Sequence, residues 1–146
     1  MSVFPDNIKY LSTPRIIEGG SSAGNYRNFN LALHVGDEES SVNANRKFLM
    51  KRYSLPSEPK WIKQTHSNIC HRVAKSHSII EADASYTEQK GVVCAILTAD
   101  CLPIFVSNKQ GSFVGVAHAG WRGIVGGVIE SLLKATNVNG KDLIVH

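Results

Sequence analysis

The fold is most readily predicted from residues 92–123, VVCAILTADCLPIFVSNKQGSFVGVAHAGWRG. Residues 92–97 are almost wholly apolar, which is typical of a strand buried on both faces. Two more strands are predicted at 103–107 and 112–118, joined by a four-residue turn at 108–111. A helix is expected to begin after Gly120 and to continue to about Thr136.

The flanking sequence adds shorter elements of both kinds. Upstream, the pattern predicts one or two short strands within 7–18, a turn-rich loop at 19–25 and a helix beginning near Asp37. Strands are expected at 61–65 and 69–74, a polar loop to about residue 90, and a last strand at 142–146. We therefore predict an α+β fold, a mixed and mainly antiparallel sheet with helices packed on it, as a single domain over residues 1–146.

Composition excludes several classes of protein. The chain has 146 residues, 42% hydrophobic and 19% charged, which is enough apolar material for a packed core. Its apolar runs are too short to span a bilayer, and the N-terminus lacks the pattern of a secretory signal. The three cysteines form no disulfide framework, and we expect Cys70 and Cys94 to be small buried side chains. A cytoplasmic protein with no membrane partner is expected.

The positive charge is unevenly distributed. The net charge is +4, and eight of the sixteen basic residues lie between Arg46 and Lys75. Such a region attracts phosphates or nucleotides, or it is a solvated surface of a helix and a strand. No arginine-rich run, zinc finger or aromatic RNA-binding motif accompanies it, so we expect no nucleic-acid partner.

One pair of residues stands out from the predicted hairpin. If 108–111 form the turn, Ser107 pairs with Ser112, and the same ladder places Cys101 directly opposite His118. Their side chains would then share a face with Cβ atoms about 5 Å apart, which suits two ligands of one metal ion or a thiol and its base. Taken singly, a cysteine is more often a small core residue and a histidine a satisfied polar group.

Seven short segments share the character of sequence motifs: NFNL (28–31), HVGD (34–37), NR (45–46), QTH (64–66), ADA (82–84), TADCLP (98–103) and AHAGWRG (117–123). In this order they resemble the blocks of the multicopper polyphenol oxidase, or laccase-domain, family, whose members include purine nucleoside phosphorylases. The resemblance implies that His66, Cys101 and His118 are the ligands of a catalytic zinc ion, with one open coordination position. His34 lies in a matching block but is not one of the family's ligands.

The resemblance also implies an activity. The expected reaction is zinc-dependent phosphorolysis of purine nucleosides, such as adenosine, inosine, guanosine and methylthioadenosine, with adenosine deamination at the same site. Purine nucleosides and inorganic phosphate are the expected partners. Arg46 is the residue we expect to bind phosphate, because guanidinium binds it in a bidentate fork.

The remaining expected site residues are polar. Asn30, Gln64 and Arg122 are expected to contact substrate or to support the ligands. Asp83 is included among the catalytic residues, although the sequence leaves open whether Asp83 or Asp100 orients a ligand histidine or holds Arg122.

Three alternatives remain open from the sequence. The first is a copper-dependent, laccase-like polyphenol oxidase, since a His–His–Cys set also suits copper. The second is a metal-free hydrolase with Cys101 as nucleophile and His118 as base, or an enzyme that edits peptidoglycan precursors. The third is a zinc-binding module without turnover.

The sequence departs from the family pattern at two places. Ser67 replaces a glycine, and the C-terminal part of the family domain does not follow Val145. We therefore expect an incomplete domain whose apolar surface between residues 92 and 116 is exposed, or is covered by self-association or by the missing portion.

Overall fold

The chain divides into two compact units. The computed structural model describes residues 3–76 and 78–146. The sheet unit contains the residues up to Tyr10 together with Pro59–His146, and the helix unit contains Leu11–Glu58. All of the predicted strands downstream of residue 60 therefore fall in the sheet unit.

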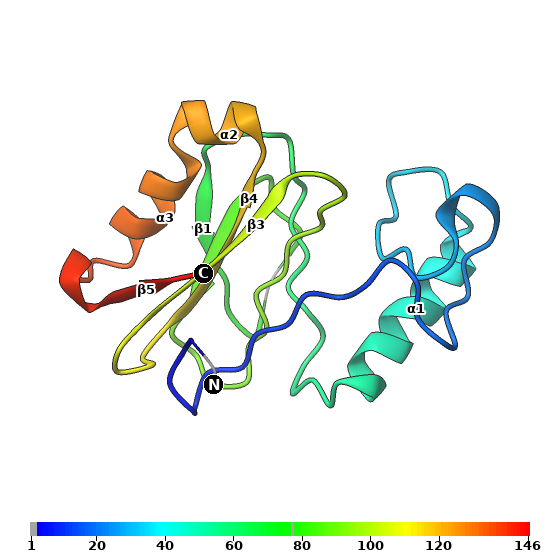
Figure 1. The fold of residues 1–146 in the computed structure, drawn as a ribbon, viewed down its shortest axis with the longest axis horizontal. Helices are drawn as coiled ribbons and strands as arrows, with labels where there is room; N and C mark the ends of the chain where they lie inside the picture. Colours follow the sequence, from blue (N-terminus) through cyan, green and yellow to red (C-terminus); the bar gives the residue numbers. More distant parts are fainter. Residues whose placement is uncertain (1–2, 77) are drawn as a thin grey trace. The chain divides into compact units, whose positions relative to one another are not determined.

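The sheet has five strands, and their arrangement confirms the predicted α+β fold (Figure 1). The strands are β1 (Cys70–Arg72), β2 (Ala84–Thr87), β3 (Leu102–Asn108), β4 (Val114–Ala119) and β5 (Leu143–Val145), in the spatial order β1-β2-β4-β3-β5. Only β1 and β2 are parallel, and the other pairs are antiparallel. The sheet is therefore mixed and mainly antiparallel.

The helix predicted after Gly120 is two helices. These are α2 (Trp121–Gly126) and α3 (Val128–Ala135), separated by Gly127, which has a φ of 86°. Glycine adopts this left-handed conformation without a steric penalty, so the chain changes direction there. The break lets α3 turn back along one face of the sheet, as Figure 1 shows.

The core of the sheet unit lies between α3 and the sheet. Its fully packed residues are Ala84, Val106, Phe113, Ala117, Val128 and Leu132. Leu132 is completely buried, and a Cβ atom on Gly115 of β4 would lie 2.9 Å from its Cδ1. Glycine at this position therefore allows α3 to approach β4 closely.

Two of the predicted strands, at 61–65 and 92–97, are wrong. Residues 61–65 and 92–97, all described, contain no strand, only the isolated bridges Lys60↔Cys94 and Lys63↔Glu81. The reason is a side chain: Gln64 Nε2 donates to Leu97 O at 2.8 Å, and Leu97 N donates to Gln64 Oε1 at 2.7 Å. The amide thus satisfies backbone groups that a neighbouring strand would otherwise satisfy.

The sequence pattern also missed a central strand. Ala84–Thr87 falls in the stretch predicted to be a polar loop, yet it forms β2 between β1 and β4. Ser85 and Thr87 are polar but buried, so hydropathy does not distinguish this strand from a loop. The apolar surface expected between residues 92 and 116 is partly exposed: Val92, Val106 and Val116 are buried, whereas Leu102 is 61% exposed.

The helix unit contains the predicted helix. Residues Glu39–Arg52 form α1, which buries Val42, Asn45 and Leu49, and a short 3-10 helix, η1, covers Gly24–Tyr26. Residues 7–18, all described, contain no strand, contrary to the prediction. Asn28 replaces a partner strand there, since its side chain accepts from Ile17 N and donates to Ile17 O.

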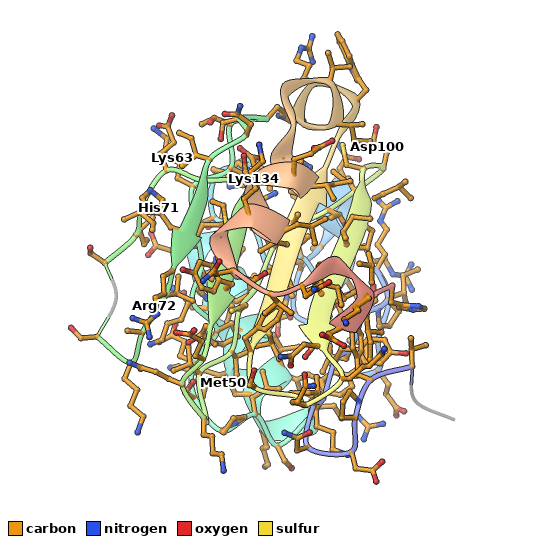
Figure 2. The ribbon with its side chains drawn as sticks, turned by 90° about the vertical axis from the view of Figure 1, so that its left-hand side faces the viewer. Met50, Lys63, His71, Arg72, Asp100 and Lys134 are labelled. Carbon is orange, nitrogen blue, oxygen red and sulfur yellow. The ribbon has the colours of Figure 1, made fainter. Side chains whose placement is uncertain are left out.

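The basic residues are divided between the two units. Arg46 and three others lie on α1, whereas Arg72 lies on the edge strand β1 of the sheet unit and Lys63 on the loop before it (Figure 2). Lys63 pairs with Glu81 at 3.4 Å and Arg72 with Glu88 at 2.6 Å, and all four side chains are exposed. This pattern is that of a solvated surface. None of the helices in the described part of the chain has the length and hydropathy of a membrane span.

We expect Leu132→Ala to lower the free energy of unfolding by about 2–5 kcal/mol, because it leaves a cavity between α3 and β4. Urea denaturation followed by circular dichroism measures the change. Val125→Ala is the matched control, since Val125 is 83% exposed, and it should change stability by less than about 0.5 kcal/mol. Equal effects of the two variants would contradict this description of the core.

We expect stability to fall in alkali. Burial raises the pKa of Cys70 to about 11 and that of Cys94 to about 12, above their ordinary value of 9.0. Above pH 9.0 the unfolded chain therefore loses protons that the folded chain keeps, so the free energy of unfolding decreases as the pH rises. Urea denaturation between pH 7 and about pH 11 should show a shallower decrease for Cys94→Ala than for the wild type. Parallel decreases would contradict the prediction.

Candidate metal centre

Three potential ligands meet at one end of the sheet. His66 lies on the loop before β1, Cys101 directly precedes β3, and His118 lies near the end of β4. One ligand atom from each lies within 4.8 Å of those from the other two, and the imidazole centroids are 4.8 Å apart. Within the described residues this is the one group of His, Cys, Asp or Glu side chains with such an arrangement.

The register of the hairpin corrects the predicted Cys101–His118 pairing. Ser107 pairs with Val114 and Pro103 with His118, which places Cys101 opposite Gly120 instead. The turn is longer than four residues because the Asn108 side chain accepts from Ser112 N and donates to Ser112 Oγ. A shift of two residues keeps side chains on the same face, so Cys101 and His118 still face the same space.

Gly120 leaves room between the ligands. A Cβ atom there would lie 2.9 Å from His66 Cδ2 and 3.0 Å from Cys101 Sγ. Any side chain at this position would therefore displace one ligand or the other. The glycine that follows β4 thus has a steric role that its position in the sequence does not reveal.

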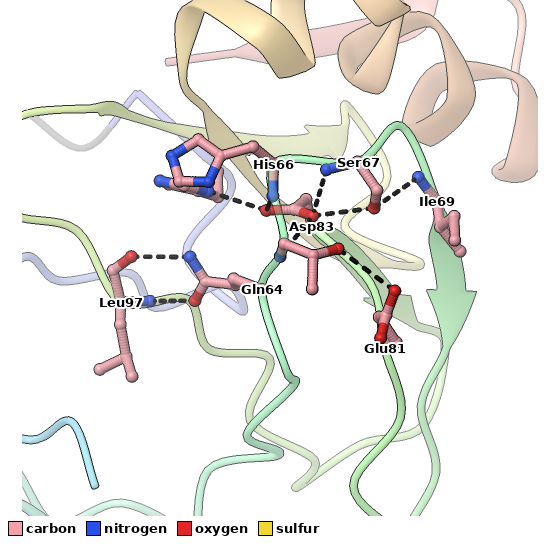
Figure 3. Close-up of polar contacts among 9 residues, drawn as sticks. Gln64, His66, Ser67, Ile69, Glu81, Asp83 and Leu97 are labelled. Carbon is pink, nitrogen blue, oxygen red and sulfur yellow. Dashed lines mark hydrogen bonds and ion pairs between the residues drawn. The ribbon is translucent and has the colours of Figure 1, made fainter. Parts of the chain in front are cut away.

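The Asp83 carboxylate links the loop at residues 65–67 with His118 (Figure 3). Its Oδ2 accepts hydrogen bonds from Thr65 N, Ser67 N and Ser67 Oγ at 3.1, 2.6 and 2.8 Å. Its Oδ1 accepts from His66 N at 3.0 Å and lies 2.9 Å from His118 Nδ1. The carboxylate is completely buried, so these partners replace the water it would otherwise bind.

The loop that carries His66 has an unusual backbone. His66 has a φ of 60°, in the left-handed region that non-glycine residues rarely adopt. Such a residue costs about 1–3 kcal/mol and persists where its surroundings hold it in place. Asn68 also fixes the loop, because its Nδ2 donates to Gly126 O at 2.7 Å.

The Asp83 carboxyl group and the Cys101 thiol have pKa values that are shifted in opposite directions. Burial alone would raise the pKa of Asp83, but hydrogen bonds from His118, Ser67 and the loop N–H groups lower it overall. Desolvation, followed by the nearby Asp100 and Asp83 carboxylates, raises the pKa of the Cys101 thiol. A bound cation opposes that effect, because a coordinated thiol is deprotonated.

The other expected site residues are divided between the units. Gln64 and Arg122 belong to the sheet unit, where Gln64 holds Leu97 and the Arg122 guanidinium lies 4.5 Å from the centre of the Trp121 ring. Asn30 and Arg46 belong to the helix unit.

Both residues of the helix unit contact its backbone. Asn30 donates to Ala32 O and Asp37 Oδ2, and Arg46 donates through Nε and Nη2 to Leu31 O at 3.0 and 2.8 Å. Asp100 lies at the end of the sheet that also carries α2 (Figure 2). It contacts Cys101, but in the described structure neither His66 nor His118 forms a hydrogen bond to it.

Sequence reasoning overlooked two contributors to this geometry. Ser67 was noted only as a departure from a family glycine, yet it supplies two of the five hydrogen bonds to Asp83. Gly120 was noted only as the start of a helix. The local signal for Ser67 is that a serine hydroxyl commonly bonds to a backbone group two residues on, as Ser67 Oγ accepts from Ile69 N at 3.2 Å.

The donor set fits a catalytic transition-metal site. Two imidazoles and a thiolate are ligands for zinc or copper, and three protein ligands leave one position open. Their exposure decreases from His66, which is exposed, through Cys101 to His118, which is 5% exposed. The described residues add no fourth ligand within the same distance.

Comparison with known proteins gives consistent results. Residues 11–145 match the model of a family described as multi-copper polyphenol oxidoreductase laccase. A purine nucleoside phosphorylase of Haemophilus influenzae is 41% identical over 140 residues, an alignment that covers 96% of this chain and 57% of that protein. Purine nucleoside phosphorylase YfiH of Escherichia coli is 38% identical over 141 residues, with coverage of 96% and 57%. The chain therefore spans somewhat more than half the length of these curated relatives.

Solved structures share the fold. A protein of Neisseria meningitidis superposes with a TM-score of 0.91 at 36% identity, covering 99% of this chain and 59% of the other. YlmD from Geobacillus stearothermophilus superposes with a TM-score of 0.79 at 30% identity, covering 87% and 53%. The coverage agrees with the predicted incomplete domain.

We expect Gly120→Ala to abolish tight binding of Co²⁺ or Zn²⁺, because the added methyl group occupies the space between His66 and Cys101. Isothermal titration calorimetry measures the affinity. Gly126→Ala is the matched control, since a Cβ atom there meets only Asn68 Cβ at 3.7 Å. Unchanged affinity of Gly120→Ala would show that the three side chains do not bind metal in this arrangement.

Proposed function

The chain belongs to the multi-copper polyphenol oxidoreductase laccase family, and we propose that it takes part in metal-dependent phosphorolysis of purine nucleosides. The observation that carries this proposal is the convergence of His66, Cys101 and His118 at one end of the sheet. The names of the relatives support it, since several are purine nucleoside phosphorylases. The chain spans somewhat more than half the length of those relatives, so their activity is a proposal for it.

We propose zinc as the metal, held by His66, Cys101 and His118. Zinc with an open position acts as a Lewis acid and makes water a better nucleophile near neutral pH. Blue-copper centres usually add a weak axial methionine, and the two methionines of this chain, Met1 and Met50, are distant in sequence from the three ligands. The three ligands suit either metal, and we propose zinc because its Lewis acidity serves the proposed reaction.

We propose that arginines bind the phosphate. Phosphorolysis requires inorganic phosphate beside the ribose carbon, and guanidinium groups bind phosphate through paired N–H donors. Arg122 follows the ligand strand and has an exposed side chain stacked on Trp121. Phosphate binding by Arg46 stays a prediction from the sequence; within the helix unit its Nε and Nη2 donate to Leu31 O.

We propose a structural role for the two amide residues, Gln64 and Asn30. The sequence predicts that Gln64 and Asn30 contact substrate or support the ligands. In the structure the Gln64 amide bonds to the backbone of Leu97, and the Asn30 amide bonds to the backbone of Ala32 and to Asp37 Oδ2. We therefore propose that they hold the loops on which the functional groups lie. Adenosine deamination is proposed at the same metal centre, because it requires an activated water that attacks the purine ring.

The test combines metal analysis with enzyme assays. The wild-type protein is expected to contain about one zinc ion per chain and to release a purine base from inosine or adenosine only when phosphate is present. Cys101→Ala should lose both metal and activity. Cys70→Ala is the matched thiol control and should keep both, since Cys70 lies in β1 and packs against the core.

Other outcomes would point to the alternatives. Copper together with phenol oxidation would replace this proposal by the laccase-like activity. Turnover that survives chelators but is lost on alkylation of Cys101 would indicate a metal-free cysteine hydrolase. Formation of inosine from adenosine without phosphate would isolate the deaminase activity.

A further inference from the structure

We propose that Asp83 is a positioning residue that fixes both histidines of the candidate metal centre in the geometry needed to bind the ion. This inference rests on the proposed metal site, and it concerns the residue behind the ligands. Asp83 is completely buried, so it acts through the groups that it holds and has no surface for substrate. Its position, directly before β2 and beside β4, allows it to reach the loop and the strand together.

The first effect of Asp83 is on the tautomer of His118. A carboxylate has acceptors only, so the His118 Nδ1 atom at 2.9 Å from Oδ1 must carry a proton. The lone pair is then left on Nε2, which is the atom available to a metal. The backbone also fixes this pair, because His118 N donates to Asp83 O at 2.7 Å. Carboxylate–histidine–metal units of this kind set both ring orientation and ligand basicity.

The second effect is on the loop that carries His66. The backbone N–H groups of Thr65, His66 and Ser67 all point toward the one carboxylate. Consecutive N–H groups that converge in this way form an anion-binding concavity, and here the anion is the Asp83 side chain. The left-handed conformation of His66 accompanies this arrangement. One side chain therefore fixes two ligands from separate parts of the sequence.

The substitution Asp83→Asn tests this role with little change of volume. In either orientation the new NH₂ group faces donors: at the Oδ2 position it meets Thr65 N and Ser67 N, and at the Oδ1 position it meets His66 N. At the Oδ1 position it also donates to His118 Nδ1, which moves the ring proton to Nε2 and blocks that atom as a ligand. Both orientations predict weaker metal binding.

The first experiment measures Co²⁺ and Zn²⁺ affinity of the intact chain by calorimetry, together with the visible spectrum of bound Co²⁺. We expect Asp83→Asn to bind about 10–100-fold more weakly and to give an altered Co²⁺ spectrum. Glu81→Gln is the matched control, because Glu81 contacts the same loop through Thr65 Oγ1 and Lys63 Nζ, each at 3.4 Å, but reaches neither histidine. It should bind as the wild type does.

The second experiment uses the wild-type chain, so it is informative even if Asp83→Asn does not fold. Long-range ¹H–¹⁵N correlation spectra of the metal-free wild type should show His118 as the Nδ1–H tautomer, with the signal assigned by its loss in His118→Gln. An Nε2–H tautomer would overturn the inference. Equal affinity and spectrum for Asp83→Asn and the wild type would also overturn it. A wild-type chain that binds no Co²⁺ would instead overturn the metal site on which the proposed function rests.

Discussion

The structure around the candidate metal centre depends on the burial of one carboxylate. Asp83 is fully enclosed, and a buried charge is tolerated only when its acceptors are satisfied. Its partners come from the loop at 65–67 and from β4, so satisfying the charge requires both segments to be in place. The same carboxylate therefore holds the loop that carries His66 and the strand that carries His118, and the β3–β4 hairpin without Asp83 would lack the group that holds His66.

The second constraint is steric. The ligands come together because the chain has no side chain at Gly120, where a Cβ atom would meet both His66 and Cys101. A similar requirement applies at Gly115, where the missing side chain lets Leu132 of α3 pack on β4. Gly115 lies on β4 beneath α3, and Gly120 directly follows β4 beside the ligands. β4 therefore combines close packing on one face with an open space at its end, and neither property follows from hydrophobicity.

The sequence predicted the class of fold better than its parts. Helical spacing located α1, which buries Val42, Asn45 and Leu49, and apolar runs on either side of a turn located the β3–β4 hairpin, where β4 is buried along nearly its whole length. These patterns failed at β2, whose buried Ser85 and Thr87 look like loop residues, and at 92–97, where Gln64 replaces a partner strand. For the site, the predicted hairpin placed Cys101 and His118 on the same face of the sheet. This placement survives the register error, because a shift of two residues does not change the face. His66 came only from family resemblance, since its place depends on a left-handed turn and on a contact 17 residues away in the sequence.

The distribution of burial among the ligands argues for a catalytic site over a structural one. A structural zinc site is closed by four protein ligands, whereas this group has three, and their exposure increases from His118 on β4 to His66 on its loop. The buried side of the group is rigid, because Asp83 and the β-ladder hold it, and the exposed side carries Asp100 and Arg122. Arg122 lies four residues after His118 and its side chain is exposed, so a guanidinium is accessible to solvent near this end of the sheet. A metal centre that acts on a small anionic or polar substrate needs ligands held rigidly by neighbouring groups and a solvent-accessible side lined by polar residues.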